Sequence, residues 1–294
     1  MATRELTGAP RILPLYARAA AATFLPGAGR LPFLPGGGEA IPTNLELELA
    51  DIAIDPGHLA AYAKVGGFGL RDQLPPTYLH VVAFPLHLAL MGDGRFPFGA
   101  VGLVHVENAI VQHRPVGLGE RLSMRVRATA LEPHPRGRAF TIVSEARADD
   151  ELVWAGESTI LRREAGGGGE RRPSADDAPP DPPPVVQWRL PGDLGRRYAA
   201  VSGDRNPIHM HDVPAKLLGF PRTIAHGMWT KARCLAALEN RLPASFSVQA
   251  RFRKPVLLPS TVTFGSVEDD GATRFAVRAA RDGAPHLDGR LEPG

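Results

Sequence analysis

The sequence predicts an α+β protein built from two related domains. A helical apolar run followed by several strand-like segments occurs twice along the 294 residues, and helices beside antiparallel strands are the pattern of an α+β fold. In addition, the segment 62–68 (Tyr-Ala-Lys-Val-Gly-Gly-Phe) matches the segment 198–204 (Tyr-Ala-Ala-Val-Ser-Gly-Asp) at Tyr, Ala, Val and Gly. Such an internal repeat indicates two copies of one structural unit.

Residues 1–40 are predicted to form an N-terminal arm that is loosely attached to the surface, because the segment is rich in proline and glycine. Pro14, Arg18 and Pro26 interrupt its apolar stretch, well short of the ~20 apolar residues that a membrane span needs. We therefore expect no membrane span.

Residues 41–164 are predicted to form the first domain. Alternating Leu and Ile residues from 45 to 54 predict a half-buried strand. A turn at Asp55-Pro56-Gly57 precedes a short helix over 58–65, and a second helical run, Leu86 to Met91, ends at a Gly-Asp-Gly sequence. Four further strands are expected near residues 101–111, 121–130, 139–148 and 152–162.

Residues 165–184 are predicted to be a linker, because a glycine run is followed by a stretch of aspartate and proline. The second domain then covers 185–294. Its helix is expected from Met228 to about Asn240, and its strands are expected near 246–253, 261–267, 274–280 and at the C-terminal end.

The segment 198–209 reads as an active-site loop. Pro207 fixes its own φ and disfavours the helical region for Asn206, so Asp204 and His209 are predicted to lie on an irregular segment rather than on one helix. A carboxylate and an imidazole held on a rigid loop can act as a general base and acid. Each of them alone is more often a turn or core residue.

Two sequence features are predicted to fix the ends of this loop region. Asp212 and Pro214 look like the cap and first turn of a short helix that stops at Gly219. Gly227 opens the apolar helix, where unpaired backbone N–H groups and the helix dipole favour a developing oxyanion. Base, acid and oxyanion hole are therefore expected within one short span.

The motif Tyr-x-x-Val-Ser-Gly-Asp-x-Asn-Pro-x-His of 198–209, followed by Ala-His-Gly-Met at 225–228, resembles the signature of the MaoC-like family of (R)-specific enoyl-thioester hydratases. The wider chain is similar to the two-domain bacterial 3-hydroxyacyl-thioester dehydratases. This resemblance implies a double hot-dog fold, in which each repeat wraps an antiparallel sheet around a central helix. It also implies a hydro-lyase of fatty-acid metabolism that reversibly hydrates trans-2-enoyl thioesters to (R)-3-hydroxyacyl thioesters.

The resemblance assigns roles to residues of the motif. Asp204 and His209 would share a water molecule and a proton, Asn206 would orient them, and the Gly227 amide would bind the thioester oxygen. His226 and Met228 are expected to contact the substrate. Which of Asp204 and His209 activates the water is left open.

The first half is predicted to be catalytically inert. Phe68 stands where Asp204 stands in the second half, and the stretch from Gly67 to Thr77 spans ten positions where Gly203 to Thr223 spans twenty, without an Asn-Pro-x-His sequence. We expect Phe68, Phe84 and the run Leu86 to Met91 to line an apolar groove for a medium or longer acyl chain. The alternative is that the N-terminal arm fills this space.

Three alternatives to a metal-free hydratase fit parts of the sequence. The chain could be a non-catalytic subunit that binds acyl thioesters, or a hot-dog thioesterase. His209, His211 and Asp212, with His226, are compatible with zinc or iron. The hydratase interpretation uses the same residues without a metal, so we predict no metal and no cofactor; no phosphate loop or dinucleotide fingerprint is present.

Charge and cysteine content limit the partners. The net charge is +3, and the arginines are scattered among acidic residues, which argues against a nucleic-acid surface. The expected partner is an acyl thioester of coenzyme A or of an acyl carrier protein. The two domains are expected to pair within the chain, and a homodimer is left open. The single cysteine, Cys234, is predicted to be a buried thiol in a cytoplasmic protein.

Overall fold

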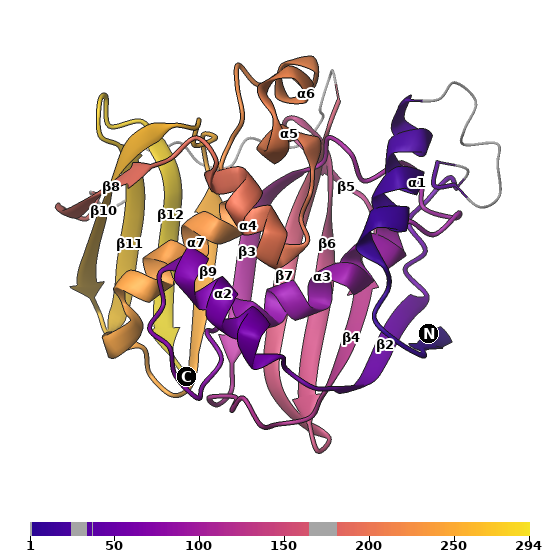
Figure 1. Ribbon diagram of the computed structural model, residues 1–294, viewed down its shortest axis with the longest axis horizontal. Helices are drawn as coiled ribbons and strands as arrows, with labels where there is room; N and C mark the ends of the chain where they lie inside the picture. The colour runs from indigo at the N-terminus through magenta and orange to yellow at the C-terminus, as the bar shows by residue number, and fades with distance from the viewer. Residues whose placement is uncertain (1, 25–33, 37, 165–180) are drawn as a thin grey trace.

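The computed structural model describes residues 2–24, 34–36, 38–164 and 181–294, with the backbone alone for 20–24. Within these residues the chain forms one twelve-stranded sheet whose concave face is covered by a layer of helices (Figure 1). The α+β prediction is therefore confirmed. No helix of the described residues is long and apolar enough to cross a membrane.

The strand order shows the internal repeat. In the first half the order is β2-β4-β6-β7-β3, and in the second half it is β8-β10-β11-β12-β9, so equivalent strands occupy equivalent places. The halves join where β3 and β9 pair in antiparallel fashion, with Asn108 opposite Ala250. The bounds are β2 Leu45–Ile52, β3 Val104–Gln112, β4 Leu122–Ala128, β5 Glu132–His134, β6 Gly137–Ala148, β7 Glu151–Arg163, β8 Pro184–Leu190, β9 Phe246–Phe252, β10 Ser260–Asp269, β11 Ala272–Ala279 and β12 Pro285–Pro293.

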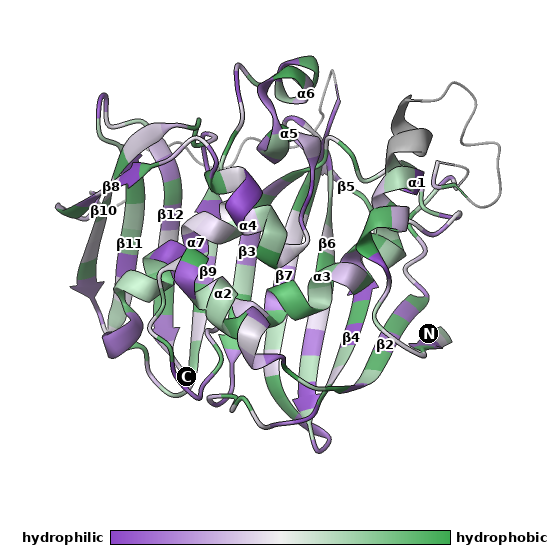
Figure 2. Ribbon diagram, in the orientation of Figure 1, coloured by the Kyte–Doolittle hydropathy of each residue, from purple (hydrophilic) through white to green (hydrophobic). Residues whose placement is uncertain are grey.

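Alternating apolar residues drive the sheet to bury one face. In β4, Leu122, Met124 and Val126 are buried, whereas the residues between them are partly exposed. Figure 2 shows the same alternation of hydrophobic and hydrophilic residues along the strands. The buried face contacts two helices, α3 (Tyr78–Met91) and α7 (Gly227–Ala237), and α2 (Pro56–Gly66) and α4 (Leu194–Ser202) pack against these helices and against each other.

The central helix of the first half is longer than predicted. α3 begins at Tyr78, eight residues before the expected run from Leu86, and it includes Pro85. A proline inside a helix removes one hydrogen bond, but most side chains of α3 are buried, so tertiary packing outweighs the local preference.

The matched tyrosines of the repeat meet at the centre of the helical layer. Tyr62 on α2 and Tyr198 on α4 have ring centroids 6.2 Å apart. Beneath them, Lys231 of α7 is fully buried, and its Nζ donates to Oδ1 of Asn108 (2.6 Å) and to the backbone oxygen of Val248 (3.0 Å). Because Asn108 lies on β3 and Val248 on β9, this lysine ties the helix to both halves.

The prediction of a loosely attached N-terminal arm is wrong for residues 2–24. β1 (Ala2–Leu6) pairs in parallel with β2, and α1 (Ile12–Phe24) lies beside α3 at the end of the helical layer (Figure 1). The strand carries no apolar alternation because it is an exposed edge strand held by backbone hydrogen bonds. Residues 25–33 and 37 of the predicted arm, and 165–180 of the predicted linker, lie outside the described residues. The domain limits stay predictions.

Short helices follow the predicted active-site loop: α5 (Pro207–Met210) and α6 (Asp212–Leu217). The expected cap role of Asp212 is wrong, because its Oδ1 accepts from the Thr223 amide (2.8 Å) while His211 is the N-cap residue. Gly219, with φ of 85°, does follow the end of α6. A 3₁₀ helix, η3 (Glu239–Arg241), follows α7.

Candidate active site

The active-site loop leaves α4 through Gly203, whose φ of 75° is costly for residues with a Cβ atom. Asp204 follows in the loop, and its amide donates to Oγ of Ser202 (3.2 Å). Pro207 then starts α5, which carries His209. The prediction that Asp204 and His209 do not share one helix is confirmed, although His209 lies on a helical turn rather than on an irregular segment.

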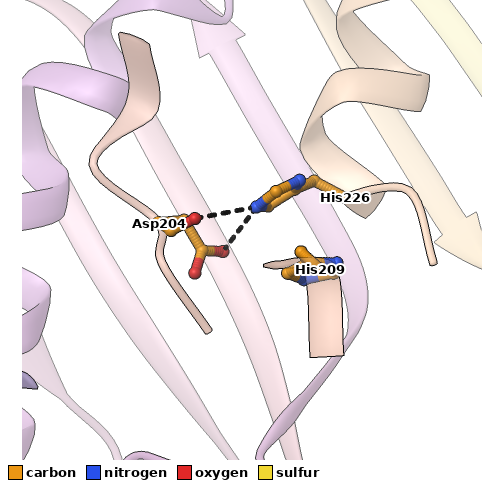
Figure 3. Close-up of side chains that lie close together, drawn as sticks. All are labelled: Asp204, His209 and His226. Atoms are coloured by element: carbon orange, nitrogen blue, oxygen red, sulfur yellow. Dashed lines mark hydrogen bonds and ion pairs between the residues drawn. The ribbon is translucent and has the colours of Figure 1, made fainter. Parts of the chain in front are cut away.

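Asp204, His209 and His226 lie together at the start of α7 (Figure 3). One ligand-type atom from each falls within 4.8 Å of the others. Nδ1 of His209 donates to the Ile224 carbonyl (2.8 Å), which leaves Nε2 free. Nε2 of His226 donates to the backbone oxygen of Asp204 (2.9 Å) and lies 3.8 Å from Oδ2 of the same residue. The two imidazole rings stack with centroids 3.6 Å apart.

The Asp204 carboxylate is held by two donors on one oxygen. Its Oδ1 accepts from the Tyr16 hydroxyl (2.9 Å) and from the Asn206 amide (3.1 Å). Burial by itself raises the pKa of Asp204, but His226, His209, the Asn206 amide and the Tyr16 hydroxyl together hold the pKa below its ordinary value. The carboxylate is therefore ionised at neutral pH, with Oδ2 left for chemistry.

Tyr16 was not found by sequence reasoning. It lies on α1, outside both repeats, and only the fold brings it to Asp204. Burial and the neighbouring Asp204 raise the pKa of Tyr16, so its hydroxyl stays a donor. The Tyr16 oxygen also accepts from the Arg205 amide (2.9 Å), which fixes the loop on both sides of Asp204.

The two histidines of the site are neutral. Burial lowers the pKa of His209, and it lowers the pKa of His226 to about 3. Neutral His209 with a proton on Nδ1 presents a basic Nε2 lone pair. Asn206 contributes through its backbone amide, while its side-chain Nδ2 approaches the Leu103 carbonyl at 3.4 Å and its buried Oδ1 has no hydrogen-bond partner among the described residues.

Gly227 begins α7, as predicted, with His226 as the N-cap residue. Its amide donates to no acceptor in the described part of the chain, whereas the Thr230 amide already bonds to the His226 carbonyl. A Cβ atom at position 227 would lie 3.1 Å from the Phe252 ring, so a larger residue here would press against that ring. The free amide at the positive end of the helix dipole can stabilise an oxyanion.

A cavity of about 170 Å³ extends from these groups beneath α3. Asp204, Asn206, His209, His226, Gly227 and Met228 line it at one end. Phe84, Leu88 and Met91 of α3 face Ile142 and Ile160 of the sheet farther in. Of the described residues in the N-terminal segment, Tyr16 contributes to the lining.

The structure does not place Phe68 in this lining. After the αL residue Gly67, the Phe68 amide bonds back to the Ala63 carbonyl (2.9 Å). This turn folds the Phe68 ring onto Tyr62, where the ring centroids are 6.4 Å apart. Leu86 is fully buried and also does not line the cavity, so of the predicted run His87, Leu88 and Met91 contribute.

The set of residues that could hold a metal ion differs from the set suggested by the sequence. Asp204, His209 and His226 form the group in the described residues that could hold an ion, and exposed His211 is not part of it. Two imidazoles and a carboxylate suit zinc or iron. However, Nε2 of His226 already carries a proton bonded to the Asp204 carbonyl, and Nδ1 of the same ring points away from Asp204. Without rearrangement, only His209 and the carboxylate offer free donors, fewer than the three protein ligands of catalytic zinc sites.

The rim of the cavity is basic. Arg136, Arg163, Arg253 and Lys254 line it and are exposed. Arg253 pairs with Asp288 (2.8 Å), but Arg136 and Arg163 have no carboxylate partner among the described residues. Burial and the nearby Arg136 lower the pKa of Arg163. Arg136 and Arg163 therefore present positive charge to a ligand that enters the cavity.

Comparisons with known proteins agree with this arrangement. A family model described as "MaoC like domain" matches residues 182–284. The chain is 39% identical over 262 residues to 3-hydroxyacyl-thioester dehydratase X of Mycobacterium tuberculosis, covering 88% of this chain and 92% of that protein. Over 69 residues it is 38% identical to 3-hydroxybutyryl-CoA dehydratase of Methylorubrum extorquens, covering 22% of this chain and 44% of that protein.

Solved structures show the same fold. The crystal structure of HtdX of Mycobacterium tuberculosis has a TM-score of 0.76 at 36% identity, covering 85% of this chain and all of that chain (100%). A MaoC-like dehydratase from Phytophthora capsici has a TM-score of 0.69 at 20% identity, covering 85% of this chain and 95% of that chain. A conserved Mycobacterium tuberculosis protein described as having a double hotdog fold has a TM-score of 0.52 at 16% identity, covering 86% of this chain and 94% of that chain. The predicted double hot-dog fold is confirmed.

Proposed function

The chain belongs to the MaoC-like family of 3-hydroxyacyl-thioester dehydratases, and from this premise we propose that Asp204, His209 and Gly227 carry out its reaction. It is a hydro-lyase that interconverts trans-2-enoyl thioesters and (R)-3-hydroxyacyl thioesters. The observation that supports the residue assignment is the pair of free atoms on one loop, Oδ2 of Asp204 and Nε2 of His209, beside the unpaired amide of Gly227.

The chemistry adds one water across the C2=C3 double bond. The water oxygen bonds to C3, and the electron pair of the double bond moves toward the thioester carbonyl, whose oxygen becomes negative. The Gly227 amide and the α7 dipole stabilise this charge. The proton released by water passes through the pair Asp204 and His209 to C2. The pair ends as it began, and the reverse sequence is the dehydration.

Tyr16 is a positioning residue in this scheme. It engages Oδ1 of Asp204, so Oδ2 is the oxygen that meets the substrate. The backbone amide of Asn206 also donates to Oδ1. His226 fixes the loop by donating to the Asp204 backbone carbonyl, and its ring supports the His209 ring by stacking. These contacts hold the acid–base pair in one geometry, which is a large part of catalytic efficiency.

The basic rim supports an anionic carrier. Arg136 and Arg163 lie close together and have no acidic partner within the described part of the chain, so a phosphate of the carrier would relieve their mutual repulsion. Coenzyme A and the phosphopantetheine arm of an acyl carrier protein both present phosphate. Thioesters of the two carriers, compared at equal acyl length, distinguish them by kcat/KM.

Two alternatives lack support in the site. A thioesterase with a carboxylate on the central helix finds none here, because neither α3 nor α7 contains Asp or Glu. A subunit that only binds acyl thioesters does not account for an intact acid–base loop. The catalytic loop comes from the second half, the cavity lining comes from both halves, and Tyr16 comes from the helix that precedes them, so we propose that one chain holds a complete site.

A spectrophotometric hydration assay with crotonyl and longer enoyl thioesters tests the proposal. Wild type is expected to hydrate them, and His209→Ala is expected to lower kcat by roughly 10² to 10⁴. His211→Ala is the matched control, because His211 is exposed and lies outside the cavity lining. Equal activity of the two variants contradicts the assignment. We also propose a reducing cytoplasm as the site of action, since the single cysteine, Cys234, is buried and cannot form a disulfide within the chain.

A further inference from the structure

Three histidines from the inert half line the same cavity, and the proposed reaction does not use them. His80 and His87 lie on α3, and His105 lies on β3. The ring centroid of His80 lies 5.3 Å from that of His87 and 5.9 Å from that of His105. We call this group the histidine cluster.

The imidazoles of the cluster are neutral, and only some of their ring nitrogens have a hydrogen-bond partner among the described residues. Burial lowers the pKa of His87 to about 3 and that of His105 to about 4, and it lowers the pKa of His80 well below its ordinary value. Nε2 of His87 is hydrogen-bonded to Oγ of Ser144 (2.7 Å). Buried Nε2 of His105 has no partner, and His80, 8% exposed, makes no side-chain hydrogen bond with the described residues.

The position of the cluster relates it to the acyl chain. The Phe252 ring packs against Gly227, and its centroid lies 5.1 Å from that of His105. The cluster therefore begins one aromatic ring beyond the proposed oxyanion site. Aliphatic residues, Leu88 and Ile160 among them, line the same cavity. A plain alkyl chain would cover the imidazole nitrogens and leave them without hydrogen bonds, which costs free energy.

We propose that the histidine cluster binds a neutral oxygen substituent, a hydroxyl or a carbonyl, on the acyl chain beyond C3. A neutral imidazole offers one N–H donor and one nitrogen acceptor, so His80 and His105 together can satisfy a hydroxyl in both directions. A carboxylate fits poorly, because it would bring a charge into a site where burial keeps the imidazoles neutral. This inference rests on the proposed function, since it assumes that the cavity holds the acyl chain.

The test compares kcat/KM for enoyl thioesters of equal length, either plain or carrying a hydroxyl or a keto group at successive carbons from C5 onward. Wild type is expected to favour one oxygenated position by about fivefold to tenfold, the effect of one added hydrogen bond. His80→Phe replaces the polar ring by an apolar one of similar size. We expect this variant to abolish or reverse the ratio of oxygenated to plain substrate.

The inference is overturned if wild type prefers the plain chain at every position, or if the preference is intact in His80→Phe. Equal rates for all substrates indicate that water alone occupies the cluster, which also overturns it. If His80→Phe does not fold, competition by saturated thioesters, plain or hydroxylated, against wild type decides the same question. Crotonyl thioester is too short to carry the substituent, so failure of wild type to hydrate it contradicts the proposed function instead.

Discussion

The hydroxyl of Tyr16 donates to Oδ1 of Asp204 at 2.9 Å, although 188 residues separate them along the chain. A helix that precedes both repeats thereby completes the environment of a carboxylate in the second repeat. The other oxygen, Oδ2, is left facing His226 at 3.8 Å and the cavity. This division of the two carboxylate oxygens gives the site its orientation.

Tyr16→Phe is expected to shift the pH profile of kcat. In the proposed mechanism Asp204 acts as a carboxylate, so we expect activity to fall when it is protonated at low pH. The Tyr16 hydrogen bond stabilises the charged carboxylate, so its loss raises the pKa of Asp204. The acid limb of the profile therefore moves to higher pH. Tyr78→Phe is the control, since that hydroxyl bonds to His58 outside the cavity lining. Superimposable profiles for wild type and Tyr16→Phe contradict the positioning role.

Acid should destabilise the protein through its buried histidines. The pKa values of His87 and His226 are about 3 and that of His105 is about 4, against about 6.5 in an unfolded chain. The folded-state values are depressed, so the unfolded chain binds more protons, and the stability present above pH 6.5 is lost as pH falls toward 4. Three such protons correspond to about 4 kcal/mol of unfolding free energy per pH unit.

Urea unfolding at pH 7, 6 and 5 measures this slope. The double variant His87→Leu with Ser144→Ala removes one titrating group and its hydrogen-bond partner together. It should reduce the slope by about 1.4 kcal/mol per pH unit. His211→Ala, at an exposed position, should leave the slope unchanged. A stability that does not vary between pH 7 and 5 is incompatible with neutral buried imidazoles.

The cavity beneath α3 should set the accepted chain length. Met91→Trp places a larger side chain in the lining and is expected to lower kcat/KM at least tenfold for eight-carbon or longer enoyl thioesters, because about 0.8 kcal/mol is lost for each methylene that can no longer be buried. Crotonyl hydration should change little. Leu217→Trp on exposed α6 is the control. An equal loss for short and long substrates would place the acyl chain elsewhere.

The contiguous part of the site could be predicted from the sequence, and the rest could not. Asp204, His209 and Gly227 belong to one motif whose turn and helix signals are local. Tyr16 and His105 carry no local signal, because only strand pairing and helix packing bring them to the cavity. Phe68 was misplaced for the same reason: its alignment with Asp204 is real, but a turn at Gly67 directs the ring onto α2.

The edge strand β1 was missed on different grounds. Its residues are exposed and show no alternation, so backbone hydrogen bonds alone define it. The central strands, such as β4, were predicted because burial of one face imposes a period of two on the sequence. Helix α3 was predicted in part, since its buried surroundings override the usual effect of Pro85.

Removal of metal should not affect activity. Prolonged dialysis against a chelator is expected to leave kcat intact, and elemental analysis is expected to find no stoichiometric ion. The reason is that Nε2 of His226 donates its proton to the Asp204 carbonyl and so is not free to bind a metal. Activity lost on dialysis and restored by zinc or iron would assign Asp204, His209 and His226 as ligands instead.

The turnover of Asp204→Asn tests the central claim most directly. The amide oxygen can still accept from Tyr16 and the Asn206 amide, so the fold is expected to persist while the carboxylate chemistry is lost. Asp212→Asn is a matched control, because an asparagine there can still accept from the Thr223 amide. We predict that kcat for enoyl-thioester hydration falls by roughly 10² to 10⁴ in Asp204→Asn and stays near wild type in Asp212→Asn. Near-normal turnover in Asp204→Asn, with a normal melting temperature, would contradict the account.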